Sequence, residues 1–192
     1  MTLTEEFTAT EIAEKICAAQ ELTLGDNTVL HNRLKYIAKR GVLKNGRTVD
    51  GRGTLAFAKL ELFRAAVFVE LIGLAMDVRA LEAVTDNAAK KFNVLAPSQD
   101  VPGGSVSRGG LLDAINGVAA GEQWFLKLWR VNPGLLDPEH IAAAFVPETV
   151  SDSDLWGNAK VDATHKRKPS RAHVTVDLTA LFDPIIKLVG TV

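Results

Sequence analysis

Residues 30–60 read LHNRLKYIAKRGVLKNGRTVDGRGTLAFAKL, and this stretch decides the fold predicted for the whole chain. It contains eight lysine or arginine residues and one acid, Asp50, which leaves a local charge of +7 in a chain whose net charge is −1. Positive charge concentrated in one segment of a balanced protein indicates a surface that meets a polyanion. The segment also has a clear order: a helical run ending at Gly41, a basic turn rich in glycine, and the start of a long apolar helix.

A short amphipathic helix is predicted just before this stretch, over residues 8–19. Thr8 or Thr10 is suited to cap its N-terminus, with Glu11 near the third helical position as in a capping box. Apolar side chains recur on one face at helical spacing. Residues 20–28 are polar and contain the turn-forming sequence Gly-Asp-Asn, so they are expected to form a connecting loop.

A second helix is predicted over residues 29–40. Apolar residues recur along one stripe of this helix, and basic residues project around its other faces. Gly41 is expected to cap its C-terminus, because glycine tolerates the positive φ of that position. Residues 44–53, which we call the wing, contain Asn-Gly and Asp-Gly turn signals and are predicted to form a small β-hairpin.

Residues 55–77 are the most hydrophobic part of the chain. They are predicted to form a mostly buried helix that breaks or kinks near Gly73. Residues 78–92 are predicted to continue as a second helical piece. The helix from Leu55 is expected to hold the second helix and the wing in place.

Residues 94–110 are rich in proline, glycine and serine and lack periodicity, which indicates a linker. It separates an N-terminal domain, residues 1–93, from a small α+β domain, residues 111–192. The predicted fold class is therefore mainly α with a small β component (α+β). The C-terminal elements are predicted as a helix over 111–121, a strand over 122–132, a helix over 138–145 in preference to a strand, a polar loop over 147–170, a strand over 171–178 and a helix over 179–189 broken near Pro184.

The sequence LKYIAKRGVL at residues 34–43 matches, in its spacing, a motif close to LRYYE-R-x-GLL. That motif ends the recognition helix of MerR-type winged helix-turn-helix proteins. Residues 8–85 resemble this family, and the phage excisionases that share its fold, in their order of elements. Gly51 and Arg52 fall where the glycine and arginine of the family's wing lie.

The chain departs from the family at several points. Ile37 and Ala38 replace an aromatic and an acidic residue of the motif, and the predicted connection at 20–28 is longer than the family's tight turn. The long C-terminal helix through which MerR-type regulators dimerise is not evident, and the cysteines of the metal-sensing members are absent. The resemblance covers less than half of the chain and implies a DNA-binding fold more than any sensor function.

The local charge and the resemblance together predict a sequence-specific DNA-binding transcriptional regulator with double-stranded DNA as its partner. Residues in the first half of the second helix would reach base edges, where arginine suits guanine and asparagine suits adenine. Basic residues of the wing and the helix ends would neutralise phosphates. The hydroxyl of Tyr36 contacts a phosphate, or its ring packs under the wing. The predicted DNA-binding residues are His31, Asn32, Arg33, Lys35, Tyr36, Lys39, Arg40, Lys44, Arg47 and Arg52.

A homodimer is expected, because a two-fold dimer doubles the length of DNA that one small reader covers. The C-terminal domain is assigned to self-association, or to binding a small-molecule or protein effector. The alternative function is a phage-type accessory or protein-interaction module that uses the winged fold without specific DNA readout. Salt-dependent DNA binding would separate the two.

Catalytic motifs are lacking: the sequence has no P-loop, GxSxG or HExxH, and its four histidines lack metal-ligand spacing. We therefore expect no enzyme, no metal and no cofactor. The single cysteine, Cys17, lies in an apolar helical run and is expected to be buried. The N-terminus lacks the features of a signal peptide, and charges interrupt every apolar stretch, so a cytoplasmic protein with no membrane partner is expected.

Two further features have open interpretations. The basic run HKRK at 165–168, with Arg171, is a solvated loop or adds non-specific DNA affinity. Trp124, Trp129 and Trp156 could line a ligand pocket, although aromatic residues on strands more often belong to the core.

Overall fold

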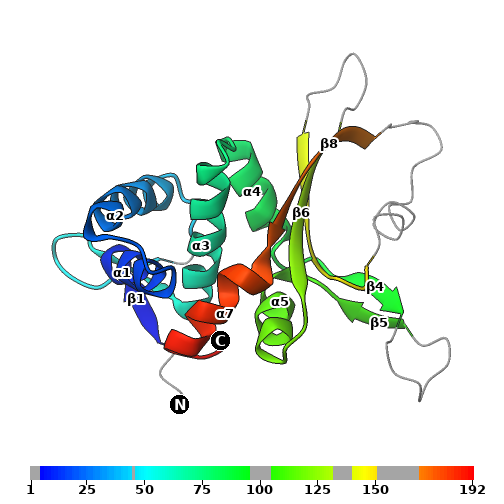
Figure 1. The fold of residues 1–192 in the computed structure, drawn as a ribbon. Coiled ribbons are helices and arrows are strands. Elements are labelled where there is room, and N and C mark those ends of the chain that lie inside the picture. The colour runs from blue at the N-terminus through cyan, green and yellow to red at the C-terminus, as the bar shows by residue number, and fades with distance from the viewer. Residues whose placement is uncertain (1–4, 45, 96–104, 132–139, 151–168) are drawn as a thin grey trace.

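A computed structural model describes residues 5–44, 46–95, 105–131, 140–150 and 169–192 (Figure 1). Within these residues it contains six helices, two three-stranded antiparallel sheets and one two-stranded antiparallel pair, and the predicted α+β class is confirmed. In chain order the elements are β1 Glu6–Thr8, α1 Ala9–Ala19, α2 Leu24–Lys39, β2 Arg47–Thr48, β3 Leu55–Ala58, α3 Lys59–Gly73, α4 Val78–Asn87, β4 Phe92–Leu95, β5 Ser105–Arg108, α5 Gly110–Ala119, β6 Trp124–Val131, β7 His140–Pro147, β8 Pro169–Asp177 and α7 Leu178–Val189.

Helix α1 begins with the predicted capping box. The Thr8 hydroxyl accepts a hydrogen bond from the Glu11 backbone N–H at 3.3 Å, and the Glu11 carboxylate accepts one from the Thr8 N–H at 2.7 Å. These reciprocal bonds satisfy two otherwise unpaired donors, and such a cap contributes about 1 kcal/mol. The buried face of the helix includes Ile12, Ile16 and Cys17, so the expected burial of the cysteine is confirmed.

Helix α2 begins at Leu24. The prediction of a loop over residues 20–28 is therefore wrong, because the loop is shorter. Helix α1 ends sharply, because Glu21 adopts a left-handed φ of 53° and the Leu22 N–H returns to the Cys17 carbonyl at 2.9 Å. The Gly-Asp-Asn sequence lies in the first turn of α2 instead of in a loop. The connection between the two helices is therefore only residues 20–23.

Helix α2 ends at the glycine that the sequence predicted. Gly41 has a φ of 68°, its N–H bonds the Ala38 carbonyl at 3.0 Å, and the Val42 N–H bonds the Ile37 carbonyl at 3.2 Å. This pair of bonds is a Schellman motif. Val42 and Leu43 then turn inward and are buried.

The predicted wing forms one strand and the turn of a hairpin, β2 and the loop after it, but the second strand, β3, lies beyond the predicted range of 44–53. Strand β3 lies between β1 and β2 in an antiparallel sheet with the order β1-β3-β2. The helix predicted from Leu55 therefore starts later, at Lys59, because residues 55–58 pair with a strand on each side. Helix α3 ends at Gly73, as predicted, and α4 follows with Asp77 as its N-cap.

The segment predicted as a linker includes the end of strand β4 and all of strand β5, which pair with each other from Phe92↔Arg108 to Leu95↔Ser105. One buried apolar cluster extends across this segment, from Phe7 in β1 to Ile185 in α7. Figure 1 shows α3 between helices α1 and α2 on one side and strand β6 on the other, with α7 against this centre. The division into two domains at residues 94–110 stays a prediction.

Two C-terminal predictions are wrong. Residues 140–147 form strand β7 instead of a helix, and all of them pair with β6. Because Phe145 and Ala144, on opposite faces of this strand, are both buried, the sequence shows no alternation. Helix α7 continues through Pro184, since Phe182 and Ile185 on either side of the proline are buried in the core.

The remaining C-terminal elements follow the sequence. The predicted helix at 111–121 and the strands at 122–132 and 171–178 correspond to α5, β6 and β8. Trp124 is fully buried, whereas Trp129 is partly buried beside a second small cluster around Val146. Trp156 and the basic run 165–168 lie outside the described residues.

Candidate nucleic-acid interface

Helix α2 divides its side chains between the core and the solvent. Leu30, Leu34 and Ile37 are 3%, 0% and 0% exposed and pack inward. Because successive residues turn by about 100° around a helix, the intervening positions face outward. Asn32, Arg33, Lys35, Lys39 and Arg40 are all exposed.

The outward-facing cations of α2 include three without an acidic partner among the described residues. Among the described residues, the side chains of Arg33, Lys35 and Lys39 form no hydrogen bond or ion pair. An exposed, unpaired cation is fully solvated and can exchange its water for a phosphate oxygen at little cost. These three side chains therefore remain available to an external anion.

The loop of the wing is ordered by one acid, Asp50. Its carboxylate accepts hydrogen bonds from the Arg52 N–H at 3.0 Å, the Thr54 N–H at 2.8 Å and the Thr54 hydroxyl at 2.6 Å. These bonds, those of Thr54 above all, lower the pKa of Asp50 below its usual range. The Arg52 side chain is exposed and forms no ion pair with the residues described here. Asp50 thus shapes the loop while leaving the Arg52 guanidinium unpaired.

Arg47 behaves differently from Arg52. Its guanidinium binds the Glu6 carboxylate of β1 through two contacts, at 2.6 Å and 3.4 Å. The pair crosses the middle strand above Ala56 and Ala58, whose small side chains leave room for it. The hydrogen bond from Arg47 lowers the pKa of Glu6. Arg47 therefore joins the outer strands of the sheet, and a phosphate would have to compete with Glu6 for it.

Two other predicted residues have neighbours within the domain. His31 is partly buried, and its Nε2 lies 3.2 Å from the Thr10 hydroxyl of α1. Tyr36 is 48% exposed, and the Arg40 guanidinium lies 5.1 Å from the centre of its ring. A cation held over an aromatic face keeps its outer edge open to solvent.

A groove of about 680 Å³ lies beside this helix. It is bounded by Val29, Arg33 and Tyr36 of α2 on one side and by the corner between α3 and α4, including Met76 and Leu81, on the other. Apart from a few polar groups, its walls are apolar. Part of the outward face of α2 thus combines basic and apolar side chains.

The residue that fixes the base of the wing was missed in the sequence. Glu61 of α3 is 3% exposed, and its carboxylate accepts the Lys44 backbone N–H at 3.1 Å and an Arg64 N–H at 2.6 Å. Burial raises the pKa of Glu61 above its usual range. In the sequence the two charges only interrupt an apolar helix, and nothing local reveals that Glu61 reaches a residue 17 positions earlier.

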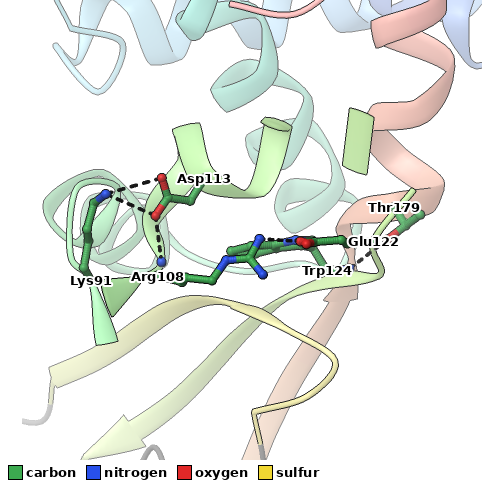
Figure 2. A network of polar contacts seen from close by, with 7 residues as sticks. Lys91, Arg108, Asp113, Glu122, Trp124 and Thr179 are labelled. Atoms are coloured by element: carbon green, nitrogen blue, oxygen red, sulfur yellow. Dashed lines mark hydrogen bonds and ion pairs between the residues drawn. The ribbon is translucent and has the colours of Figure 1, made fainter. Parts of the chain in front are cut away.

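A second set of charged side chains lies in the C-terminal half (Figure 2). Lys91 pairs with Asp113 at 3.3 Å, and Arg108 pairs with Glu122 while its guanidinium lies 5.1 Å from the Trp124 ring. Hydrogen bonding from Arg108 lowers the pKa of Glu122. Figure 2 shows Arg108, Glu122 and Trp124 aligned in one layer. Both cations already have carboxylate partners.

The same network connects three elements of the fold. The Trp124 indole N–H donates to Glu122 at 2.9 Å, and the Trp124 backbone N–H donates to the Thr179 hydroxyl at 2.9 Å. A β-carbon added to Gly117 of α5 would lie 2.0 Å from the indole nitrogen. The cluster therefore joins α5, β6 and α7, and a pocket of about 260 Å³ lies beside it.

No group of three or more His, Cys, Asp or Glu side chains in the described ranges is arranged to hold a metal ion. No helix of those ranges is long and apolar enough to cross a membrane.

Comparison with protein families, with characterised proteins and with solved structures found no match to this chain.

Proposed function

We propose that this protein binds double-stranded DNA in a sequence-specific manner and regulates transcription. The observation that carries the proposal is the contrast between cations within residues 30–60. Arg33, Lys35, Lys39 and Arg52 are exposed and unpaired within the described chain, whereas Arg47 and Lys59 pair with Glu6 and Glu5. In Figure 1 α2 lies at the end of the molecule opposite strands β6 and β8.

The local architecture supports insertion of α2 into a groove of DNA. The major groove of B-DNA is about 12 Å wide and admits one α-helix. Helix α2 follows α1 after only four residues, 20–23, and leads within eight residues into the β2–β3 hairpin. This is the order of a helix-turn-helix with a wing.

The roles of the side chains follow from their positions. Asn32 and Arg33, in the first half of the exposed face, are assigned to base edges, because their planar groups make two hydrogen bonds to adenine and guanine. Lys35, Lys39 and Arg52 are assigned to phosphates, which position the protein without reading sequence. A two-fold dimer would place two α2 helices in successive major grooves.

The test is a comparison of two substitutions on one DNA site, selected from a random library with the purified protein. Arg33→Ala is expected to weaken binding to that site by about 1–3 kcal/mol and to relax the preference at one base position. Lys39→Ala is expected to weaken binding to all sequences alike. Failure of the wild-type protein to bind any duplex at low salt would exclude the proposal.

The apolar groove beside α2 favours a second candidate function, a protein-interaction module without specific DNA readout. Val29 and Tyr36 are 51% and 48% exposed at its edge, so they continue the apolar lining of the groove onto the surface, where a partner's apolar side chains could pack. In that case Val29→Asp would abolish partner binding. Selection from the random DNA library would then yield no enriched sequence.

A further inference from the structure

The short segment between α2 and β2 sets the position of the wing relative to the helix. It begins with Gly41 and includes Val42, Leu43 and Lys44, and the β2–β3 hairpin starts three residues later. A DNA-binding surface built from a helix and a wing requires a fixed separation, because phosphates and base edges lie at fixed positions on the duplex. The contacts of this segment therefore determine whether both parts can bind at once.

Three kinds of contact hold the segment. The Schellman motif fixes its start, and the side chains of Val42 and Leu43 are each 4% exposed. The Thr85 hydroxyl of α4 lies 3.4 Å from the Val42 carbonyl. At the end of the segment, the Lys44 N–H donates to Glu61 Oε2 at 3.1 Å.

The Glu61 carboxylate is itself held from the other side. Its Oε1 accepts a hydrogen bond from Arg64 Nη1 at 2.6 Å, one turn further along α3, and Arg64 is 7% exposed. Arg64 Nε is buried without a hydrogen-bond partner among the described residues. Arg64 therefore orients Glu61, and Glu61 transmits that orientation to the backbone at Lys44.

A buried ion pair is a poor source of stability. The cost of removing both charges from water often equals or exceeds their attraction, and an apolar pair of similar volume is commonly as stable or more so. The unbonded Arg64 Nε adds to that cost. Stability alone does not account for a glutamate at this position in a helix whose other inward side chains are mainly apolar.

We propose that Glu61 is a positioning residue that fixes the wing relative to α2 by accepting the Lys44 N–H, so that helix and wing bind DNA as one rigid surface. This inference rests on the proposed function. The hydrogen-bond acceptor at position 61 sets the affinity for DNA, whether or not position 61 is charged and whatever the free energy of unfolding of the protein.

Two double variants separate the acceptor from the charge. In Glu61→Gln with Arg64→Met, the amide oxygen still accepts the Lys44 N–H and no buried charge remains. In Glu61→Met with Arg64→Met, the volume is similar and the charge is equally absent, but no acceptor is left. The two proteins differ only in the side-chain amide at position 61, whose oxygen is the acceptor for the Lys44 N–H. Chemical denaturation of both gives the fraction folded.

The expected result is a difference between the two variants in three measurements. The variant with methionine at both positions should exchange the Lys44 amide hydrogen about tenfold faster and bind DNA about tenfold more weakly, the usual effect of one lost hydrogen bond. Residual dipolar couplings of the wing amides should change relative to those of α2. The variant with glutamine should match the wild-type protein in all three.

Equal DNA affinity of the two folded variants would overturn the inference, as would equal protection of the Lys44 amide. A core variant of the same helix, Leu71→Ala, provides the stability control, because it should lower stability without changing either property per folded molecule. If the wild-type protein binds no DNA, the proposed function fails, whereas the exchange and dipolar measurements still decide whether Glu61 positions the wing.

Discussion

The basic segment at residues 30–60 and the polar network around Arg108 contain the same kinds of side chain and use them in opposite ways. In the network, Arg108 and Lys91 each have a carboxylate partner, and the Arg108 guanidinium also lies against the Trp124 ring. In the basic segment, Arg33 and Lys35 lie in solvent without a partner in the described chain. The first arrangement joins elements of the fold, and the second leaves charge available to another molecule.

This contrast refines the significance of the +7 charge. Two of the eight cations in the segment belong to the structural kind: Arg47 binds Glu6, and Lys59 binds both Glu5 and the Val189 carbonyl at the end of α7. A count of charges in the sequence treats all eight alike. The partners of these cations in the structure distinguish the two that stabilise the sheet and α7 from those that face outward.

The largest expected effect is in the network. Gly117→Ala would place a β-carbon 2.0 Å from the Trp124 indole nitrogen and 2.7 Å from the Glu122 carboxylate. Overpacking of this degree is expected to reduce the free energy of unfolding by about 3 kcal/mol, measured by urea denaturation. The matched control is Gly51→Ala in the wing, where the added β-carbon would have no neighbouring atom within 4 Å beyond its own chain neighbours. A similar loss in both variants would show that the network is not tightly packed.

The next effect separates the two regions by DNA affinity. Arg33→Ala should weaken specific DNA binding by about 2 kcal/mol and leave the free energy of unfolding within about 0.5 kcal/mol of wild type. Arg108→Ala should lower the free energy of unfolding and leave DNA affinity unchanged, because it removes the partner of Glu122 and a contact of Trp124. Fluorescence polarisation and denaturation of both proteins provide the comparison. Equal DNA affinities for the two variants would remove the functional distinction between the regions.

A smaller effect is expected where the two kinds of cation meet, at Arg47. Glu6→Gln removes the charge that holds the Arg47 guanidinium and should free it for a phosphate. One additional phosphate contact would steepen the dependence of log K on log salt concentration by about 0.9. Titrations at four salt concentrations measure this slope. An unchanged slope would assign Arg47 to the sheet alone.

The smallest expected effect is the pH dependence of the network. Because Arg108 lowers the folded-state pKa of Glu122 below the ordinary value of 4.5, the unfolded chain binds this proton first as pH falls. The stabilisation is complete above the unfolded-state pKa and is lost as pH falls through the folded-state value. Denaturation between pH 6 and pH 3 should show a shallower decline for Glu122→Gln than for wild type. Parallel declines would mean that the pair contributes nothing measurable.

Local signals in the sequence predicted the elements around the basic segment well. The capping box at Thr8 and the glycine cap at Gly41 depend only on residues within a few positions of each other. The helical stripe and the hairpin turns have the same local origin. These features place α1, the end of α2 and the turn of the wing without knowledge of the rest of the chain, whereas the predictions for the start of α2 and for strand β3 are wrong.

The errors lie where distant partners decide the structure. Strand β3 has no strong β pattern of its own and is extended because it pairs with β1, nearly 50 residues earlier. The alanine-rich strand β7 has both faces buried and therefore shows no alternation. The bond between Glu61 and the Lys44 backbone has no sequence signature, since any glutamate in α3 would look the same.

The most direct test of the account is the affinity of the wild-type protein for a DNA duplex as a function of salt concentration. If Lys35, Lys39 and Arg52 contact phosphates, log K should fall linearly with log salt concentration, with a slope of about −3 for each protomer bound. Combined removal of Lys35, Lys39 and Arg52 should bring that slope close to zero. Absence of binding at 50 mM salt, or a slope unchanged by the triple substitution, would contradict the claim that these side chains form a DNA-binding surface.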